Sequence, residues 1–249
     1  MECLERKHST MGHGLFTATA GAVARRTQLD LTANNLANST TVGFRAQRVS
    51  FQEVLQDPAA PSRHVVELGR PMVSAARGAI ERTGRKLDLT MQDEGFLVAD
   101  NGAGGRVLLR SVTAEVGTDG SLTDAMGRRL AFAGGDARID PASPVEIGDH
   151  GEIFQRGREV GRLLMVGVVD PRALSPVGGG GYVPNAQSGD AAPISARVVS
   201  GALERSNVNP VSNMVRMIAL ERDYQSLTRV ITAYREADEG VITAASSRG

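Results

Sequence analysis

The fold is decided by residues 211–245, whose sequence is VSNMVRMIALERDYQSLTRVITAYREADEGVITAA. This stretch has the pattern of one long amphipathic helix, because apolar residues recur along it at steps of 3 and 4: Met217, Leu220, Tyr224, Leu227, Ile231 and Tyr234. The alternation is that of a coiled-coil seam. At about 1.5 Å per residue the helix would be roughly 50 Å long. An apolar face of that length needs a partner to cover it.

A second seam lies near the other end of the chain. Leu15, Ala22, Leu29 and Leu36 are evenly spaced in a segment rich in Ala and Leu, and this spacing predicts a helix up to Asn38. Two alternatives are open, because a pattern reports an apolar face and never its partner. The seams pair within one chain as a helical hairpin, or they face neighbouring subunits.

Composition excludes several classes of function. The chain has 249 residues, 41% of them hydrophobic, and 28 basic residues balance 28 acidic ones, so no net field attracts nucleic acid or an anionic membrane. Aromatic residues make up 4% and Trp is absent, which disfavours stacking platforms. Cys3 is the sole cysteine, so no intrachain disulfide can form. No run approaches the roughly 20 apolar residues of a membrane span, and we expect no lipid insertion.

The middle of the chain changes period. From Lys86 apolar residues alternate with polar ones, as in Leu87, Leu89 and Met91, and this predicts a domain of short strands. The segment 170–193 is rich in Pro and Gly and reads as a loop. Its glycine run, 178–181, lacks the following Lys-Ser or Lys-Thr of a phosphate-binding loop.

The predicted architecture is α+β, with long N- and C-terminal helices in a coiled-coil-like axial element and a central all-β domain of short antiparallel strands. Five segments are expected: an unstructured extension (1–10), an axial helix and turn (11–43), an irregular connector (44–85), the β domain (86–200) and a C-terminal axial helix (201–249).

Candidate catalytic groups are scattered. The histidines lack metal-ligand spacing, and Ser206 is not in a nucleophile-elbow motif. Asp88, Asp93 and Glu94 are close in sequence, yet solvated strand and turn carboxylates explain them as well as an acid–base pair does. We therefore predict no catalytic residue, metal or cofactor.

Asparagines crowd the end of the first helix. Asn34, Asn35 and Asn38 favour a helix stop, with Gly43 supplying a positive φ in the turn that follows. The asparagines are candidates either for helix termination or for lateral contacts with another subunit.

Two stretches at opposite ends resemble one known family. ANNLAN (33–38) with TVGFR (41–45) resembles the N-terminal signature of bacterial flagellar basal-body rod and hook proteins, and GALERSNVNPV (201–211) is similar to their C-terminal signature. DEGFLV (93–98) resembles a strand of the same family. Val42 stands where the family usually has Thr.

The resemblance implies a structural subunit of the rod, with the terminal helices toward the rod axis. The length of the chain and the sequence ALERDY (219–224) favour the proximal-rod member over a distal-rod or hook-type subunit. The implied partners are other rod subunits, further copies of the chain and the flagellar type III export apparatus. The implied location is the basal-body rod that crosses the periplasm, reached without a cleavable signal peptide. Met11 is then the expected start.

Two sets of residues are expected to carry this function. The signature turn comprises Gly43, Phe44, Ser206 and Asn207. The expected assembly interface comprises Leu15, Leu29, Asn34, Asn35, Leu36, Asn38, Met217, Leu220, Tyr224, Leu227, Ile231 and Tyr234. The competing classes are an enzyme or binding protein built on the β domain, and a cytoplasmic coiled-coil adaptor.

Overall fold

The computed structural model describes all residues except 1, 56–63, 103, 136 and 247–249. It combines two long helices with short antiparallel strands, which confirms the mixed helix and strand content expected from the sequence. The chain divides into two compact units. Unit 1 holds residues 1–36, 49–70 and 210–249, and unit 2 holds residues 37–48 and 71–209.

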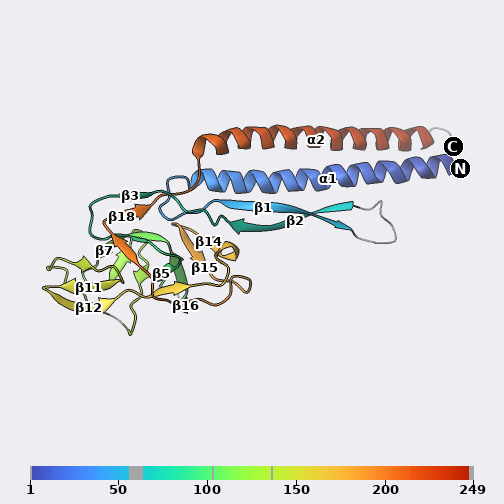
Figure 1. Ribbon diagram of the computed structural model, residues 1–249. Helices are drawn as coiled ribbons and strands as arrows, with labels where there is room; N and C mark the ends of the chain where they lie inside the picture. Colours follow the sequence, from blue (N-terminus) through green and yellow to red (C-terminus); the bar gives the residue numbers. More distant parts are fainter. Residues whose placement is uncertain (1, 56–63, 103, 136, 247–249) are drawn as a thin grey trace. The chain divides into compact units, whose positions relative to one another are not determined.

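Unit 1 contains an antiparallel pair of helices, α1 (Glu2–Ala37) and α2 (Pro210–Ser246). They lie side by side in Figure 1, the blue helix beside the red one. Gly14 lies against Tyr234, and Gly21 lies against Leu227. Each step of seven residues forward on α1 is thus matched by seven residues back on α2. This register favours the alternative in which the seams pair within one chain, while supercoiling of the pair stays a prediction.

The helix α1 begins at Glu2, so the prediction of an unstructured extension over residues 1–10 differs from the structure. The first residues lack an apolar rhythm, but Glu2, Leu4, Glu5 and Arg6 all have high helix propensity. Extending an existing helix adds a backbone hydrogen bond for each residue fixed. The absence of an apolar pattern before Met11 therefore did not mark the start of the helix.

The predicted irregular connector, 44–85, is mostly strand. β1 (Gln47–Leu55) and β2 (His64–Val73) form a two-stranded sheet, and β3 (Ile80–Arg82) follows. Gly69 and Pro71 suggested irregular backbone, but Gly69 serves close strand approach, since a Cβ there would lie 2.8 Å from the Ser50 carbonyl oxygen. The breaker cluster between the two strands falls in 56–63, outside the described residues.

Unit 2 is built on one large antiparallel sheet with the order β14-β15-β6-β5-β9-β8-β7-β4-β17, in which β13 also pairs with β5 and β16. A smaller sheet has the order β10-β11-β12. The bounds are β4 (Asp88–Met91), β5 (Phe96–Asp100), β6 (Arg106–Leu109), β7 (Ser111–Val116), β8 (Leu122–Asp124), β9 (Arg129–Leu130), β10 (Glu146–Ile147), β11 (Glu152–Gln155), β12 (Arg158–Arg162), β13 (Met165–Gly167), β14 (Ser175–Val177), β15 (Gly181–Val183), β16 (Ala192–Pro193) and β17 (Val198–Ser200).

The predicted boundaries of the β domain were too narrow. β18 (Ala202–Glu204) pairs with β3, although 201–249 was predicted to be a helical segment. Residues 202–209 and 37–48 belong to unit 2 with the strands. Pro210 starts α2 because proline is tolerated in the first turn of a helix and disfavours helix before it.

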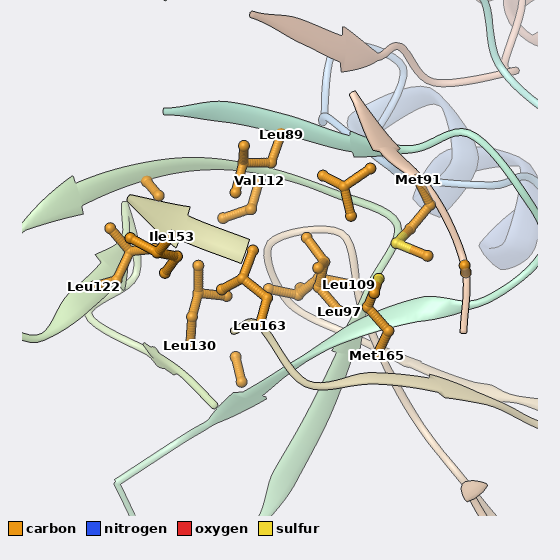
Figure 2. Packing of buried hydrophobic residues seen from close by; sticks show 14 of the residues in the cluster. Leu89, Met91, Leu97, Leu109, Val112, Leu122, Leu130, Ile153, Leu163 and Met165 are labelled. Atoms are coloured by element: carbon orange, nitrogen blue, oxygen red, sulfur yellow. The ribbon is translucent and has the colours of Figure 1, made fainter. Parts of the chain in front are cut away.

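The main core of unit 2 is aliphatic. Leu89 and Val112 are paired in register between β4 and β7, and Figure 2 shows their side chains next to each other. Leu97 and Leu109 are paired between β5 and β6, and each is at most 1% exposed. Strands far apart in sequence therefore meet in one apolar cluster, which extends to Leu163.

The predicted loop over 170–193 contains a short 3-10 helix, η1 (Pro171–Ala173), and the hairpin β14–β15. Gly179 and Gly180 have φ of +67° in the turn, and a Cβ on Gly180 would overlap the carbonyl oxygen of Val42. Gly180 is thus required for close packing against the turn that follows α1. The glycine run connects β14 to β15, two strands that pair with each other.

Neither α1 nor α2, over the residues that the structure describes, has an apolar stretch of the length that a bilayer requires.

Leu109→Ala should lower the free energy of unfolding by about 2 to 5 kcal/mol, because a fully buried side chain leaves a cavity in a packed core. Val169→Ala is the control: Val169 is 87% exposed, and its removal should change stability by less than about 0.5 kcal/mol. Urea denaturation measures both. Equal losses for the two variants would contradict this core.

Candidate assembly site

The predicted seam of α2 is the protected face of that helix. Within residues 217–240, every side chain that is not exposed belongs to one of the six predicted positions. Leu220 is the most buried at 5% exposure, and the other five are half-buried. The seam prediction for α2 therefore identified the correct face. The side chain of Val241, where the seam was expected to resume, lies outside the described residues.

The seam of α2 lies against α1 within the chain, where Gly14 meets Tyr234 and Gly21 meets Leu227. Leu15, Leu29 and Leu36 are half-buried, and an ion pair joins Arg25 Nε to Asp223 Oδ2 at 3.4 Å across the two helices. Gly14 allows close approach, since a Cβ there would lie 2.5 Å from the Tyr234 hydroxyl oxygen. The structure thus gives the seam a partner inside the subunit. Direct contact of these residues with a neighbouring subunit stays a proposal.

An exposed apolar stripe lies at the start of α2. Val211, Val215 and Ile218 are 70%, 64% and 52% exposed, and Met214 is 48% exposed beside them. Their spacing places them on one helix face. They were absent from the predicted interface, although the same steps of 3 and 4 could have identified them. We call these four residues the outer stripe.

The three asparagines at the end of α1 have different surroundings. Asn34 is exposed, and Asn35 is buried at 6% exposure. The Asn38 carbonyl accepts a hydrogen bond from the Thr41 N–H, and the Asn38 Oδ1 accepts one from the Thr41 hydroxyl. Asn38 thus closes the turn after α1, in agreement with a role in helix termination.

The segments that follow α1 and precede α2 meet inside unit 2. The Gly43 N–H donates to the Glu204 carbonyl at 2.8 Å, and the Ala46 N–H donates to Asn207 Oδ1 at 2.7 Å. Asn207 Nδ2 also donates to the carbonyl of Ala76 at 2.7 Å. Gly43 has a φ of +70°, as predicted. Both signature stretches are therefore bonded to each other through residues of the predicted turn.

A buried charged group lies at this meeting point. Glu204 is 1% exposed, and its Oε2 accepts from Arg110 Nη2 at 3.1 Å and from Arg110 Nε at 3.3 Å. Glu204 Oε1 accepts from Arg45 Nε at 3.4 Å. We call Gly43, Arg45, Arg110, Tyr182, Glu204 and Asn207 the junction cluster.

Arg110 is satisfied on all sides although it is fully buried. Its guanidinium also donates to the backbone carbonyls of Met91, Asp93 and Gly95. Burial lowers the pKa of Arg110, and the nearby Glu204 carboxylate acts in the opposite direction. Because both ends of the ion pair are hydrogen-bonded, the charges fix one arrangement of the surrounding strands.

Tyr182 completes the cluster from β15. Its hydroxyl accepts from the Arg45 N–H at 2.8 Å and donates to the Gly43 carbonyl at 3.1 Å. The side chain is 1% exposed, and burial raises the pKa of Tyr182 to about 12. The phenol thus holds both backbone groups of the turn.

Sequence reasoning found two of the six residues of the junction cluster. It named Gly43 and Asn207, and Phe44 is buried as a signature residue should be, but Ser206 only accepts from the nearby Val208 N–H. It missed the buried roles of Arg110 and Glu204. Arginine and glutamate are normally exposed, so no signal in one sequence marks a buried pair of them.

The residues that the structure describes hold no group of metal-ligating side chains. Asp93 forms an exposed ion pair with Arg197 at 3.1 Å, and the hydrogen bond from Arg197 lowers the pKa of Asp93. Asp88 is buried and lies 3.8 Å from Arg85 Nε. The carboxylates thus have separate cationic partners, as structural ion pairs do.

Two family profiles of known proteins match the regions that contain these two signature stretches. The family profile described as "Flagella basal body rod protein" matches residues 15–45, and "Flagellar basal body rod FlgEFG protein C-terminal" matches residues 199–243. The flagellar basal-body rod protein FlgF of Salmonella typhimurium is 32% identical over 240 residues, with 91% of this chain and 95% of the relative covered. The chain belongs to the flagellar basal-body rod protein family.

Other members of this family give the same result. FlgF of Rhizobium meliloti is 30% identical over 246 residues, covering 96% of this chain and 100% of the relative. The rod protein FlgG of Bacillus subtilis is 26% identical over 255 residues, covering 91% and 96%. Similarity to FlgF thus spans α1, unit 2 and α2 together. The family is one of structural rod proteins, and the chain is not an enzyme.

Gly43→Ala should destabilise unit 2 by more than Gly127→Ala does. Both glycines have positive φ, +70° and +76°, so both substitutions carry the strain of a left-handed residue, about 1 to 2 kcal/mol. Only at Gly43 would the new Cβ also press on a neighbour, 3.1 Å from the Ser111 amide nitrogen, whereas nothing lies within 4 Å at Gly127. Thermal denaturation gives the difference, and equal melting temperatures would refute the close packing at the turn.

Tyr182 should make unit 2 less stable at high pH. Because its folded pKa is raised, the neutral phenol contributes stability that is complete below about pH 10 and is lost as pH rises toward about 12. The loss should reach up to about 3 kcal/mol. Tyr182→Phe should lack this component, which denaturant titrations at several pH values would measure. An unchanged pH profile in that variant would contradict burial of the phenol.

Proposed function

We propose that the chain is a structural subunit of the flagellar basal-body rod and occupies the proximal rod. The observation that carries this is the meeting of both signature stretches at the junction cluster, in a chain that matches FlgF over nearly its full length. The alternative is a distal-rod or hook-type subunit. The FlgG relative has lower identity, 26% against 30% and 32%, and this favours the proximal position.

Assembly would use the helix pair as one element. The seam residues hold α1 and α2 together, and the outer stripe offers apolar side chains to the next subunit. Burying a Val, Met or Ile contributes about 1.5 to 3 kcal/mol, so a few such residues can support a contact. A surface that docks on a different surface of the next copy generates a helical array. Neighbours would be further copies of this chain and other rod subunits.

Torque would pass through the junction cluster. The chain crosses between its helices and the β strands in segments that both belong to unit 2 and are bonded to each other there. Buried groups with all their hydrogen bonds made, as Arg110 has, rigidify their surroundings. A twisting load on the helices would therefore act on two crossing segments joined together.

The family resemblance supports a route and a location. We propose that the chain travels through the flagellar type III export apparatus without a cleaved signal and takes its place in the rod across the periplasm. The balance of 28 basic and 28 acidic residues gives nucleic acid no electrostatic advantage as a partner. Its helices, over the described residues, offer no membrane span.

Deletion of the gene tests the proposal. Cells without it should lose swimming, and complementation with the chain from Met1 or from Met11 should restore swimming and place the protein in purified hook-basal bodies. Normal swimming after deletion, together with absence of the protein from basal bodies, would refute a rod role.

Two substitutions separate the seam from the outer stripe. Leu227→Asp should weaken the pairing of α1 with α2, because it places a charge in the covered seam, while unit 2 stays folded. Ile218→Asp should leave the monomer as stable as before, since Ile218 is 52% exposed, yet block incorporation into basal bodies. Ser226→Asp, at an exposed position of the same helix, is the control. Immunoblots of basal bodies report incorporation, and normal incorporation of Ile218→Asp would exclude the outer stripe as a contact.

A further inference from the structure

The last strands of unit 2 pair with strands that come early in the same unit. β17 pairs with β4, in the register Val198 to Met91 and Ser200 to Leu89, and it is the terminal strand of the sheet beside β4. All four residues of β4 are buried. Until β17 is in place, β4 presents an unpaired edge with apolar side chains.

Backbone bonds from the same region reach several distant strands. The Gly201 N–H donates to the Asp88 carbonyl, and the Val198 N–H donates to the Asp149 carbonyl, both at 2.8 Å. The Arg205 N–H donates to the carbonyl of Ala79 at 2.8 Å. Ala196, Val198 and Ala202 are also buried. The segment 196–208 therefore contributes to the core and to three separate parts of unit 2.

Buried charges also make the early part of unit 2 depend on the segment 196–208. Arg45 and Arg110 come early in the chain and are 3% and 0% exposed, and Glu204 is the carboxylate that contacts both guanidinium groups. If the early strands closed without Glu204, two cations would be buried without this anion. A buried ion pair that loses one partner is strongly destabilising, because an uncompensated charge remains in a poorly polar interior.

We infer that residues 196–208 form a closing segment on which folding of unit 2 depends. The strands β4 to β9 do not form a stable sheet ahead of it, and they become protected only when β17 and β18 dock and Glu204 meets Arg45 and Arg110. If the residues of the chain become available for folding in order from the amino terminus, unit 2 therefore stays unfolded until residue 208 is available. This concerns folding alone and holds whether or not the chain works in a rod.

Pulse-labelled hydrogen exchange during refolding of the full-length chain tests the inference. The amides of Met91 and Ala114, which donate to the carbonyls of Arg110 and Leu87 in the early part of the sheet, should become protected in the same kinetic phase as those of Val198 and Gly201. Protection of Met91 and Ala114 in a phase about tenfold faster would overturn the inference.

Glu204→Gln, measured in the full chain, adds a kinetic test. If Glu204 acts in the rate-limiting step, its folding rate should fall about tenfold while the unfolding rate changes less than about twofold. Glu81→Gln is the matched control, since Glu81 lies on the paired strand β3 and its carboxylate forms an exposed ion pair with Arg205. An unchanged folding rate with faster unfolding of Glu204→Gln would contradict the closing role. Where Glu204→Gln does not fold, the hydrogen-exchange labelling of the unaltered chain decides the question.

Discussion

The structure of unit 2 depends on one buried carboxylate. Glu204 contacts the guanidinium groups of Arg45 and Arg110, and its backbone carbonyl accepts from the Gly43 N–H. Removing two guanidinium groups from water is unfavourable by several kcal/mol for each ion, and this is offset only where good geometry and additional hydrogen bonds are present. The three backbone carbonyls around Arg110 provide those bonds for that residue, whereas the buried Nη2 of Arg45 has no hydrogen-bond partner among the described residues. The arrangement therefore specifies one relative placement of the turn after α1, the β5–β6 region and β18.

The remaining parts of the junction follow from this constraint. The turn must pass close to the strands, so Gly43 adopts a positive φ where a side chain would press on Ser111. Its backbone groups are then buried, and Tyr182 and Asn207 satisfy them. Gly180 in the β14–β15 turn leaves room for Val42. The residues of both signature stretches thus meet where the chain leaves α1 and where it enters α2.

The sequence predicted those parts that rest on periodicity or on backbone conformation. The seam face of α2 was identified because a helix repeats every 3.6 residues, and Gly43 because few residues other than glycine tolerate positive φ. The partner of the seam could not be predicted, since an apolar helix face can pack against any other apolar face of suitable shape. The start of α1 was missed because propensity sustained the helix where packing signals ended.

Other features depend on tertiary contacts that no local pattern encodes. Gly69 resembled a breaker but serves the approach of β2 to Ser50. β18 was missed because it has only three residues and precedes a long helix by a few residues. The pairing of Glu204 with Arg110 joins residues separated by 94 positions. Such a contact follows from the arrangement of strands and cannot be read from spacing along the chain.

A double-mutant cycle between Arg110 and Glu204 tests the central claim most directly. The free energy of unfolding would be measured for the unaltered chain, Arg110→Met, Glu204→Leu and the double variant. We predict that each single substitution destabilises strongly and that the double variant is less destabilised than the sum, by a coupling of about 1.5 kcal/mol or more. Additivity within about 0.5 kcal/mol would show that the two residues do not depend on each other, and would contradict the role of Glu204 as the group that holds the junction together.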